Sequence, residues 1–325
     1  MKAINLIKKV STTTLLGCSL VLSSYSLAAN FPENTIHVVV PWKAGGGTDA
    51  VARAAVQGMK NYTDVSIVVD NISGAAGTVG SVKVAKGKAD GYTVLFNGTS
   101  EISSGLTFKN LPFSLDDFKY VGTVYESPTW MLSHKDRGYS SLDDFLERAK
   151  SSPGELTIGV GGASGAHMIM ASAIKGMLGL DVRIIPFSGG QDLKKALISN
   201  QIDAGVIHAP VLLPAIKTGL IDVLVTGKSL KNISYEPLRD VKTLKDYGMD
   251  IEFSVSRALM VPVNTPDEVV LTLADIAQKS ATSDTFAKFG ESFGFKPVWI
   301  NGEDTKKMIY RDLKRFKEIK SSYID

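Results

Sequence analysis

The chain is poor in cysteine, in histidine and in long apolar runs, and each shortage excludes a class of protein. Cys18 is its only cysteine, so disulfides cannot stabilise the fold and a hydrophobic core must do so. The four histidines, His37, His134, His167 and His208, lack the spacing of metal ligands, and no metal or other cofactor is expected. After the N-terminal region, no run of about 18 apolar residues predicts a membrane span.

The N-terminal region has the pattern of an export signal. A lysine-rich start leads into an uncharged stretch over 10–27 and then into small residues up to Ala29. This predicts a signal peptide over residues 1–28, cleaved after Ala28 or Ala29, and a periplasmic protein. A lipoprotein anchored through Cys18 is the minor alternative.

The charge balance gives no sign of a nucleic-acid partner. The chain has 36 basic and 33 acidic residues, and three of the lysines lie in the predicted leader, which leaves 33 of each sign. No basic cluster resembles a surface that follows phosphates. About 297 residues remain after the leader, enough for one large or two medium domains.

Strands and helices alternate in two sets, which predicts an α/β fold with parallel strands under helices. The first set has strands at 36–41, 65–69 and 92–96 and helices at 49–60 and 79–85. The second has strands at 157–160, 182–185, 204–207 and 223–226 and helices at 142–150, 167–178, 191–199 and 212–217. Extended segments at 121–124, 129–133 and 251–261 and helices at 267–279, 283–293 and 302–320 complete the pattern.

Two α/β sets with two extended connections predict two lobes. Lobe one would comprise residues 29–130 and 252–325, and lobe two residues 131–251. A pair of crossing strands would form a hinge that lets one lobe close on the other.

Five of the predicted strands run into short loops of glycine and small or hydroxylated residues. These loops cover residues 42–49, 70–78, 97–100, 161–167 and 186–190. In an open parallel sheet they share the carboxyl edge, where ligands bind, and most of them open helices. Amide N–H groups at helix starts bind anions. At about 1.5–3 kcal/mol per hydrogen bond to a charged group, about four such bonds would give micromolar affinity without any arginine.

These loops carry a family resemblance. The run over 41–49 with Arg53, the loop 74–77 and the segments 89–93, 159–167 and 186–190 resemble the extracytoplasmic receptors of tripartite tricarboxylate transporters, the Bug family. The resemblance extends from about residue 30 to the C-terminus. It implies a type II periplasmic-binding-protein fold, with two α/β lobes joined by two crossing strands. It also implies a monomeric receptor that binds a small organic carboxylate, a di- or tricarboxylate, and delivers it to membrane permease subunits.

The resemblance also implies which residues contact the ligand. They are Ala44, Gly45, Gly46, Gly47, Thr48, Asp49, Thr99 and Ser100 from lobe one and Ser164, Gly165, His167, Ser188 and Gly189 from lobe two. Lys43 and Glu101 depart from the family pattern, where small neutral residues are common, so they bear on ligand preference.

Several of these residues have alternative roles. Thr48 and Asp49 suit a helix cap, although Asp49 could instead meet a ligand ammonium group. Ser164 suits both a cap and a ligand hydroxyl. His167 and His208 could each face the ligand or be structural.

Two further residues are open in the same way. Arg257, on the return crossing, suits a hinge or inter-lobe salt bridge better than ligand contact. Trp42 could form a pocket wall or part of the core.

Enzyme motifs are absent from the sequence. No Gly-x-Ser-x-Gly elbow, Walker loop or Gly-x-Gly-x-x-Gly after the first strand occurs. The protein is therefore predicted not to be an enzyme. Two alternatives stay open: a receptor that signals to a sensor protein, and an exported α/β enzyme that acts on a carboxylate.

Overall fold

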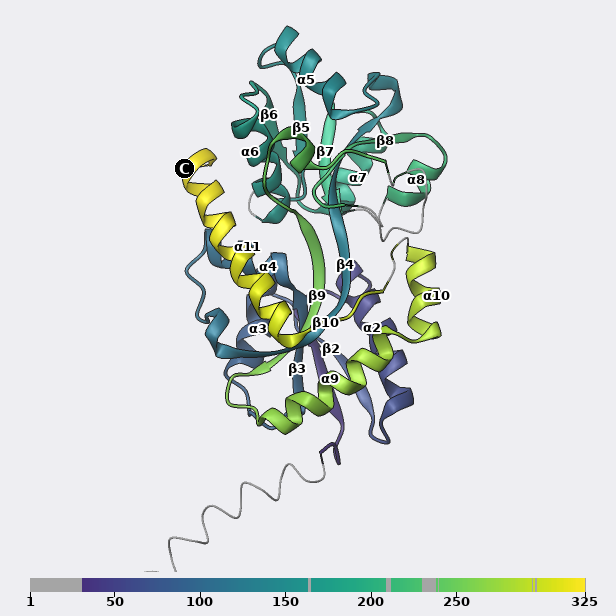
Figure 1. Cartoon of the computed structure of the whole chain (residues 1–325), viewed down its shortest axis with the longest axis vertical. Coiled ribbons are helices and arrows are strands. Elements are labelled where there is room, and N and C mark those ends of the chain that lie inside the picture. Colours follow the sequence, from purple (N-terminus) through teal and green to yellow (C-terminus); the bar gives the residue numbers. More distant parts are fainter. Residues whose placement is uncertain are drawn as a thin grey trace, which may run out of the picture.

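The computed structural model describes residues 31–162, 165–208, 212–229, 238, 240–293, 295 and 297–324. The predicted signal peptide, with Cys18, lies outside these residues. Helices and strands form two groups along the long axis of the molecule (Figure 1). The predicted α/β class is confirmed.

The first group is built on a sheet with strand order β2-β1-β3-β9-β4. Its parallel part consists of β1 (Ile36–Val40), β2 (Ile67–Asn71) and β3 (Thr93–Gly98). Two antiparallel strands follow, β9 (Ser254–Pro262) and β4 (Phe118–His134), and the short β10 (Ile300–Asn301) pairs with β4.

Both faces of this sheet are covered, because successive residues of its strands point to opposite sides. Val38 and Val40 belong to one core cluster, whereas Val39 belongs to another. The first cluster lies under α2 (Gly47–Met59), α9 (Asp267–Ala281) and α10 (Asp284–Phe293). The second lies under α3 (Thr78–Ala85), α4 (Thr99–Phe108) and the first half of α11 (Gly302–Tyr323).

The second group repeats this plan. β5 (Thr157–Val160) pairs in parallel with β6 (Arg183–Pro186) and β7 (Ala204–His208), and β8 (Ile221–Thr226) runs antiparallel to β4. One cluster packs under α5 (Leu142–Ser151) and α6 (Ala166–Met177). Another packs under α7 (Gly190–Ile198) and α8 (Leu213–Lys217).

The two groups are joined by β4 and β9, which cross between them (Figure 1). β4 changes partners in its middle: Pro128 pairs with Ser254 of β9, and Thr129 pairs with His208 of β7. The sequence predicted this strand as two pieces, at 121–124 and 129–133.

One further helix was not predicted, and another contacts both groups. α4 was not predicted, because its serines, threonines and glycine are typical of a loop. The whole of α11 was assigned to lobe one, but its second half packs on the other group, where Phe316 and Ile319 are buried in the core under α6. Among the residues described, no helix is both long and apolar enough to cross a membrane.

Candidate ligand-binding site

A cavity of about 440 Å³ is lined by residues from both groups, within the size range of small-molecule sites. The first group contributes Trp42, the start of α3, the end of β3 and much of α4. The second contributes the loop after β5, the start of α6, the loop after β6 and the end of β7. Elements from the carboxyl ends of both parallel sheets therefore meet at one cavity.

Three helix starts line this cavity without a side-chain cap. The N-cap residues are Gly77 for α3, Gly165 for α6 and Gly189 for α7. At Gly165 the φ angle is +130°, which L side chains rarely adopt. The first turns of α3 and α6 contain no acidic residue, whereas α7 has Asp192. The positive ends of helix dipoles from opposite groups thus face one space. At α3 the Thr78 and Val79 N–H groups already donate to the Ala75 and Gly74 carbonyls.

A carboxylate of the chain itself lies in the first turn of α2. Asp49 accepts hydrogen bonds from the Gly45 N–H (2.8 Å), from Arg53 Nε (3.0 Å) and from Asn71 Nδ2 (2.9 Å). Burial acts to raise the pKa of Asp49, but these hydrogen bonds outweigh it and lower the pKa. The predicted cap needs correction, because the N-cap residue is Gly46 and Asp49 lies in the first turn of α2.

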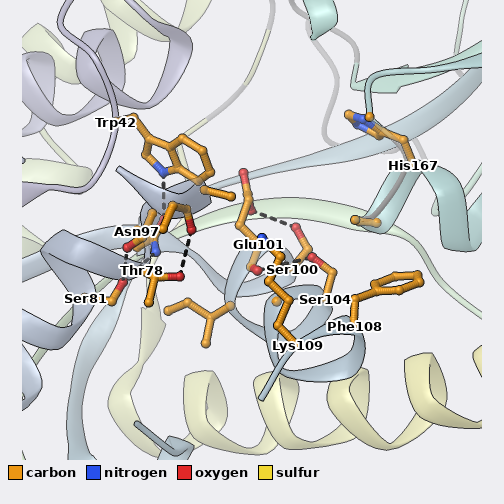
Figure 2. A pocket seen from close by; sticks show the side chains of 18 of the residues that line it. Trp42, Thr78, Ser81, Asn97, Ser100, Glu101, Ser104, Phe108, Lys109 and His167 are labelled. Carbon is orange, nitrogen blue, oxygen red and sulfur yellow. Dashed lines mark hydrogen bonds between the residues drawn. The ribbon is translucent and has the colours of Figure 1, made fainter. Parts of the chain in front are cut away.

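The start of α4 also holds a carboxylate, and this one faces the cavity. Glu101 Oε1 pairs with Arg257 Nη1 at 2.9 Å, and Ser100 Oγ donates to Glu101 Oε2 at 2.9 Å (Figure 2). Arg257 lies on β9, next to β3, the strand that leads into α4. Its ion pair with Glu101 therefore lies within the first group, so one of the two predicted roles, a salt bridge between the lobes, is not formed. The other predicted role, a place at the hinge, stays a prediction.

Two histidines of the second group lie together in the cavity wall. His208 Nδ1 and His167 Nε2 are 3.2 Å apart, and the rings stack with centroids 5.3 Å apart. Burial, opposed by Glu101 and reinforced by Arg257, lowers the pKa of His167 to about 4. Burial, His167 and Arg257 hold the pKa of His208 well below its usual value. Both rings are therefore neutral at pH 7 and can donate or accept hydrogen bonds.

A chain of hydrogen bonds fixes Trp42 in the opposite wall (Figure 2). Trp42 Nε1 donates to Asn97 Oδ1 (2.9 Å), Asn97 Nδ2 donates to Ser81 Oγ (3.4 Å), and Ser81 Oγ donates to the Gly77 carbonyl (2.9 Å). Trp42 also packs against the first core cluster, so it combines the two roles that the sequence left open.

The predicted contact residues fall into three sets. Those that line the cavity are Ser100, Gly165, His167, Ser188, Gly189 and His208. Those that are described but do not line it are Ala44, Gly45, Gly46, Gly47, Thr48, Asp49 and Thr99. Ser164 lies outside the described residues. The Thr99 hydroxyl instead bonds to that of Ser256, which fixes α4 on β9.

The sequence prediction missed much of the first-group wall. The omitted residues include Ala75, Ala76, Gly77 and Thr78 at the start of α3, and Ser104 and Phe108 on α4. Glu101, which the sequence linked to ligand preference but not to direct contact, also lines the cavity. The loop before α3 is one of the five glycine-containing loops, so its pattern could have identified it. Nothing in the sequence marks α4 as a helix, so its inward face could not be assigned. Within the described ranges, no cluster of three potential ligands could hold a metal ion.

Comparisons with known proteins agree with this geometry. A family model described as "Tripartite tricarboxylate transporter family receptor" matches residues 51–323. A UPF0065 protein of Bordetella pertussis is 28% identical over 318 residues, covering 97% of this chain and 96% of that protein. A TctC solute-binding protein from Polaromonas, solved without ligand, has a TM-score of 0.79 and 25% identity, covering 90% and 99% of the two chains. The R. palustris protein Rpa4515, solved with adipate, has a TM-score of 0.76 and 22% identity, covering 90% and 98%. The predicted periplasmic-binding-protein fold is thereby confirmed.

Proposed function

Since the chain belongs to the tripartite tricarboxylate transporter receptor family, we propose that it captures a small organic carboxylate in the cavity between its two groups. Proteins of this family are solute-binding receptors, and the chain is not an enzyme. The observation that carries the proposal is the meeting of uncapped helix starts, Gly77 of α3 and Gly165 of α6, at one cavity.

The chemistry of the cavity supports an anionic ligand. The amide N–H groups at the start of α6 are donors that need no ordering of long side chains, and the dipoles of α3 and α6 favour negative charge. His167 adds a neutral imidazole beside the start of α6. The adipate bound by the R. palustris relative supports the carboxylate class, and a di- or tricarboxylate is the class that the sequence predicts.

The division into lobes at 29–130 plus 252–325 and at 131–251 is part of this proposal. The change of partners of β4 between Pro128 and Thr129 supports the first boundary, and the start of β9 at Ser254 supports the second. A ligand that touches both lobes favours the closed arrangement by its differential affinity. The protein would act in the periplasm as a monomer, after loss of residues 1–28, and deliver its ligand to permease subunits.

A thermal-shift screen of the mature protein against di- and tricarboxylates, amino acids and aromatic acids tests capture. A ligand at 100 times its dissociation constant adds about 2.7 kcal/mol to the free energy of unfolding, so the melting temperature should rise by several degrees. Failure of every acid in this range to raise it would contradict the proposal.

Gly189→Val tests the site. A Cβ at Gly189 meets no atom within 4 Å, and its φ of 173° suits any residue, so valine fills the cavity without straining the fold. The variant should melt as the wild type does but bind at least tenfold more weakly. Unchanged affinity would contradict the site. Gly47→Val tests the predicted contacts at 44–49 separately, because a Cβ at Gly47 also meets no atom within 4 Å. If Gly47→Val loses binding, the site extends to this loop.

Delivery to a permease is tested by uptake. A strain that lacks this protein should lose accumulation of the ligand identified in the screen. Accumulation that is unchanged, together with an altered transcriptional response to the ligand, would favour the sensor alternative.

A further inference from the structure

Glu101 places a carboxylate in the wall of a cavity that is proposed to receive a carboxylate. We propose that Glu101 selects the ligand: it receives an ammonium group of a molecule whose carboxylate lies at the starts of α3 and α6. In this arrangement the Glu101 carboxylate occupies the position in which a second carboxylate of the ligand would have to bind. The inference rests on the proposed function and narrows its ligand class.

Two contacts and an adjacent glycine hold Glu101 in position. Arg257 Nη1 binds Oε1 at 2.9 Å, and Ser100 Oγ binds Oε2 at 2.9 Å. Gly98 provides the space, since a Cβ there would lie 1.7 Å from Glu101 Oε2 and 2.6 Å from Arg257 Nη1. The ion pair therefore rests directly on the backbone at the start of α4, where the helix dipole also favours a negative charge.

The carboxylate of this pair, and not the guanidinium, faces the ligand. The Glu101 side chain is 26% exposed and lines the cavity, whereas the Arg257 side chain is 5% exposed and is not among the described lining residues. Lys109 also lines the cavity but is exposed, so solvent screens its charge. The nearest charge that an incoming group meets at this wall is negative.

The surroundings of Glu101 suit an ammonium group. A carboxylate has about four acceptor positions, and the two hydrogen bonds from Arg257 and Ser100 leave acceptor capacity for a ligand. Trp42 lines the same cavity, and its indole is fixed by Asn97. Figure 2 shows Trp42 and Glu101 both reaching into the cavity from the first group. An aromatic face and a carboxylate are the two groups that attract ammonium ions in proteins.

Matched ligand pairs test the inference by isothermal titration. Each pair has the same number of methylene groups and differs in one end group: β-alanine and succinate, 4-aminobutyrate and glutarate, 5-aminopentanoate and adipate. In the wild type, the amino acid of the best-fitting pair should bind at least tenfold more tightly than its diacid. Glu101→Gln should weaken the amino acid at least tenfold and strengthen the diacid, because the neutral amide neither attracts the ammonium group nor repels a second carboxylate.

Glu303→Gln is the matched control. Glu303 also lies in the first turn of a helix and pairs with a cation, Lys307, but it lies outside the cavity lining. For each pair, the ratio of the dissociation constant of the amino acid to that of the diacid should equal the wild-type ratio. A wild-type preference for the diacids, or equal binding within each pair, would overturn the inference. This outcome does not depend on whether Glu101→Gln folds. It would leave the proposed capture of a carboxylate intact. If none of the six compounds binds to the wild type or to a folded Glu101→Gln, both proposals fail for linear carboxylates.

Discussion

At the scale of single residues, the site depends on two close fits. Gly98 allows the Glu101–Arg257 pair to rest on the backbone. The stacked, half-buried imidazoles of His167 and His208 stay neutral because their partial removal from water lowers the pKa of each. Neither the packing at Gly98 nor the stacking of the two histidines could be predicted from the sequence. A glycine after a strand indicates only that some group packs closely against the backbone, without identifying that group. The surroundings of a histidine depend on contacts between segments that are distant in the sequence.

Gly98→Ala should destabilise the protein. The added methyl group would overlap the end of the Glu101 side chain, which would have to turn away and leave the buried Arg257 without this partner, at a cost of about 1–3 kcal/mol. Urea unfolding of the ligand-free protein measures this cost. Gly47→Ala, where a Cβ meets nothing within 4 Å, should change stability by less than about 0.5 kcal/mol or raise it slightly. Equal stability of the two variants would contradict the close packing at Gly98.

His167 should make the protein less stable in mild acid. Its folded-state pKa of about 4 lies below the ordinary value of 6.5, so between these values the unfolded chain binds a proton that the folded chain does not. Stability is therefore complete above pH 6.5 and is lost as the pH falls towards 4. At pH 5 the loss from this group is up to about 2 kcal/mol.

Urea unfolding at pH 7 and pH 5 measures this effect. His167→Gln should lose less stability between the two pH values than the wild type does. His37→Gln, at an exposed imidazole outside the cavity lining, should keep the wild-type difference. An identical loss in the wild type and in His167→Gln would refute the assignment.

At the scale of elements, the sequence predicts most of the fold because local signals and tertiary structure agree. The strand at 157–160 and the helix that follows Ser141, with its capping box to Asp144, match the structure closely. α4 escapes prediction because its inward face is lined with Ser100, Ser103 and Ser104. These side chains suit helices poorly, and tertiary hydrogen bonds such as that from Ser103 to the Ile309 carbonyl stabilise them.

α11 is the element whose role the sequence concealed, since its apolar spacing shows a buried face but not the partner of that face. Its buried Ile309 packs in the first group, and Phe316 packs in the second, against Phe253 with ring centroids 5.8 Å apart. The helix therefore runs alongside β4 and β9 as a third link between the groups (Figure 1).

Phe316→Ala should cost about 3–5 kcal/mol of stability, as removal of a buried aromatic ring usually does. Calorimetric unfolding measures it. Lys317→Ala, at the next and exposed position of the same helix, should change stability by less than about 0.5 kcal/mol. A loss for Phe316→Ala no larger than that of the control would show that the second half of α11 is not packed on the second group.

At the scale of the whole molecule, the chain brings loops from two separate sheets to one cavity. The sequence predicts this convergence, because parallel strands end at a common edge and two α/β sets need two connections. It assigns too much of the site to the loop at 44–49 and too little to α3 and α4. Asp49 places a negative charge in the first turn of α2, which disfavours an anion there, whereas the cavity lies against helix faces that loop composition does not reveal.

The most direct test of the central claim is a crystal structure of the mature protein with the tightest-binding carboxylate from the screen. We predict one ligand between the groups, with a carboxylate oxygen within hydrogen-bonding distance of amides at the starts of both α3 and α6. A ligand bound elsewhere, or held by residues of one group alone, would contradict the claim.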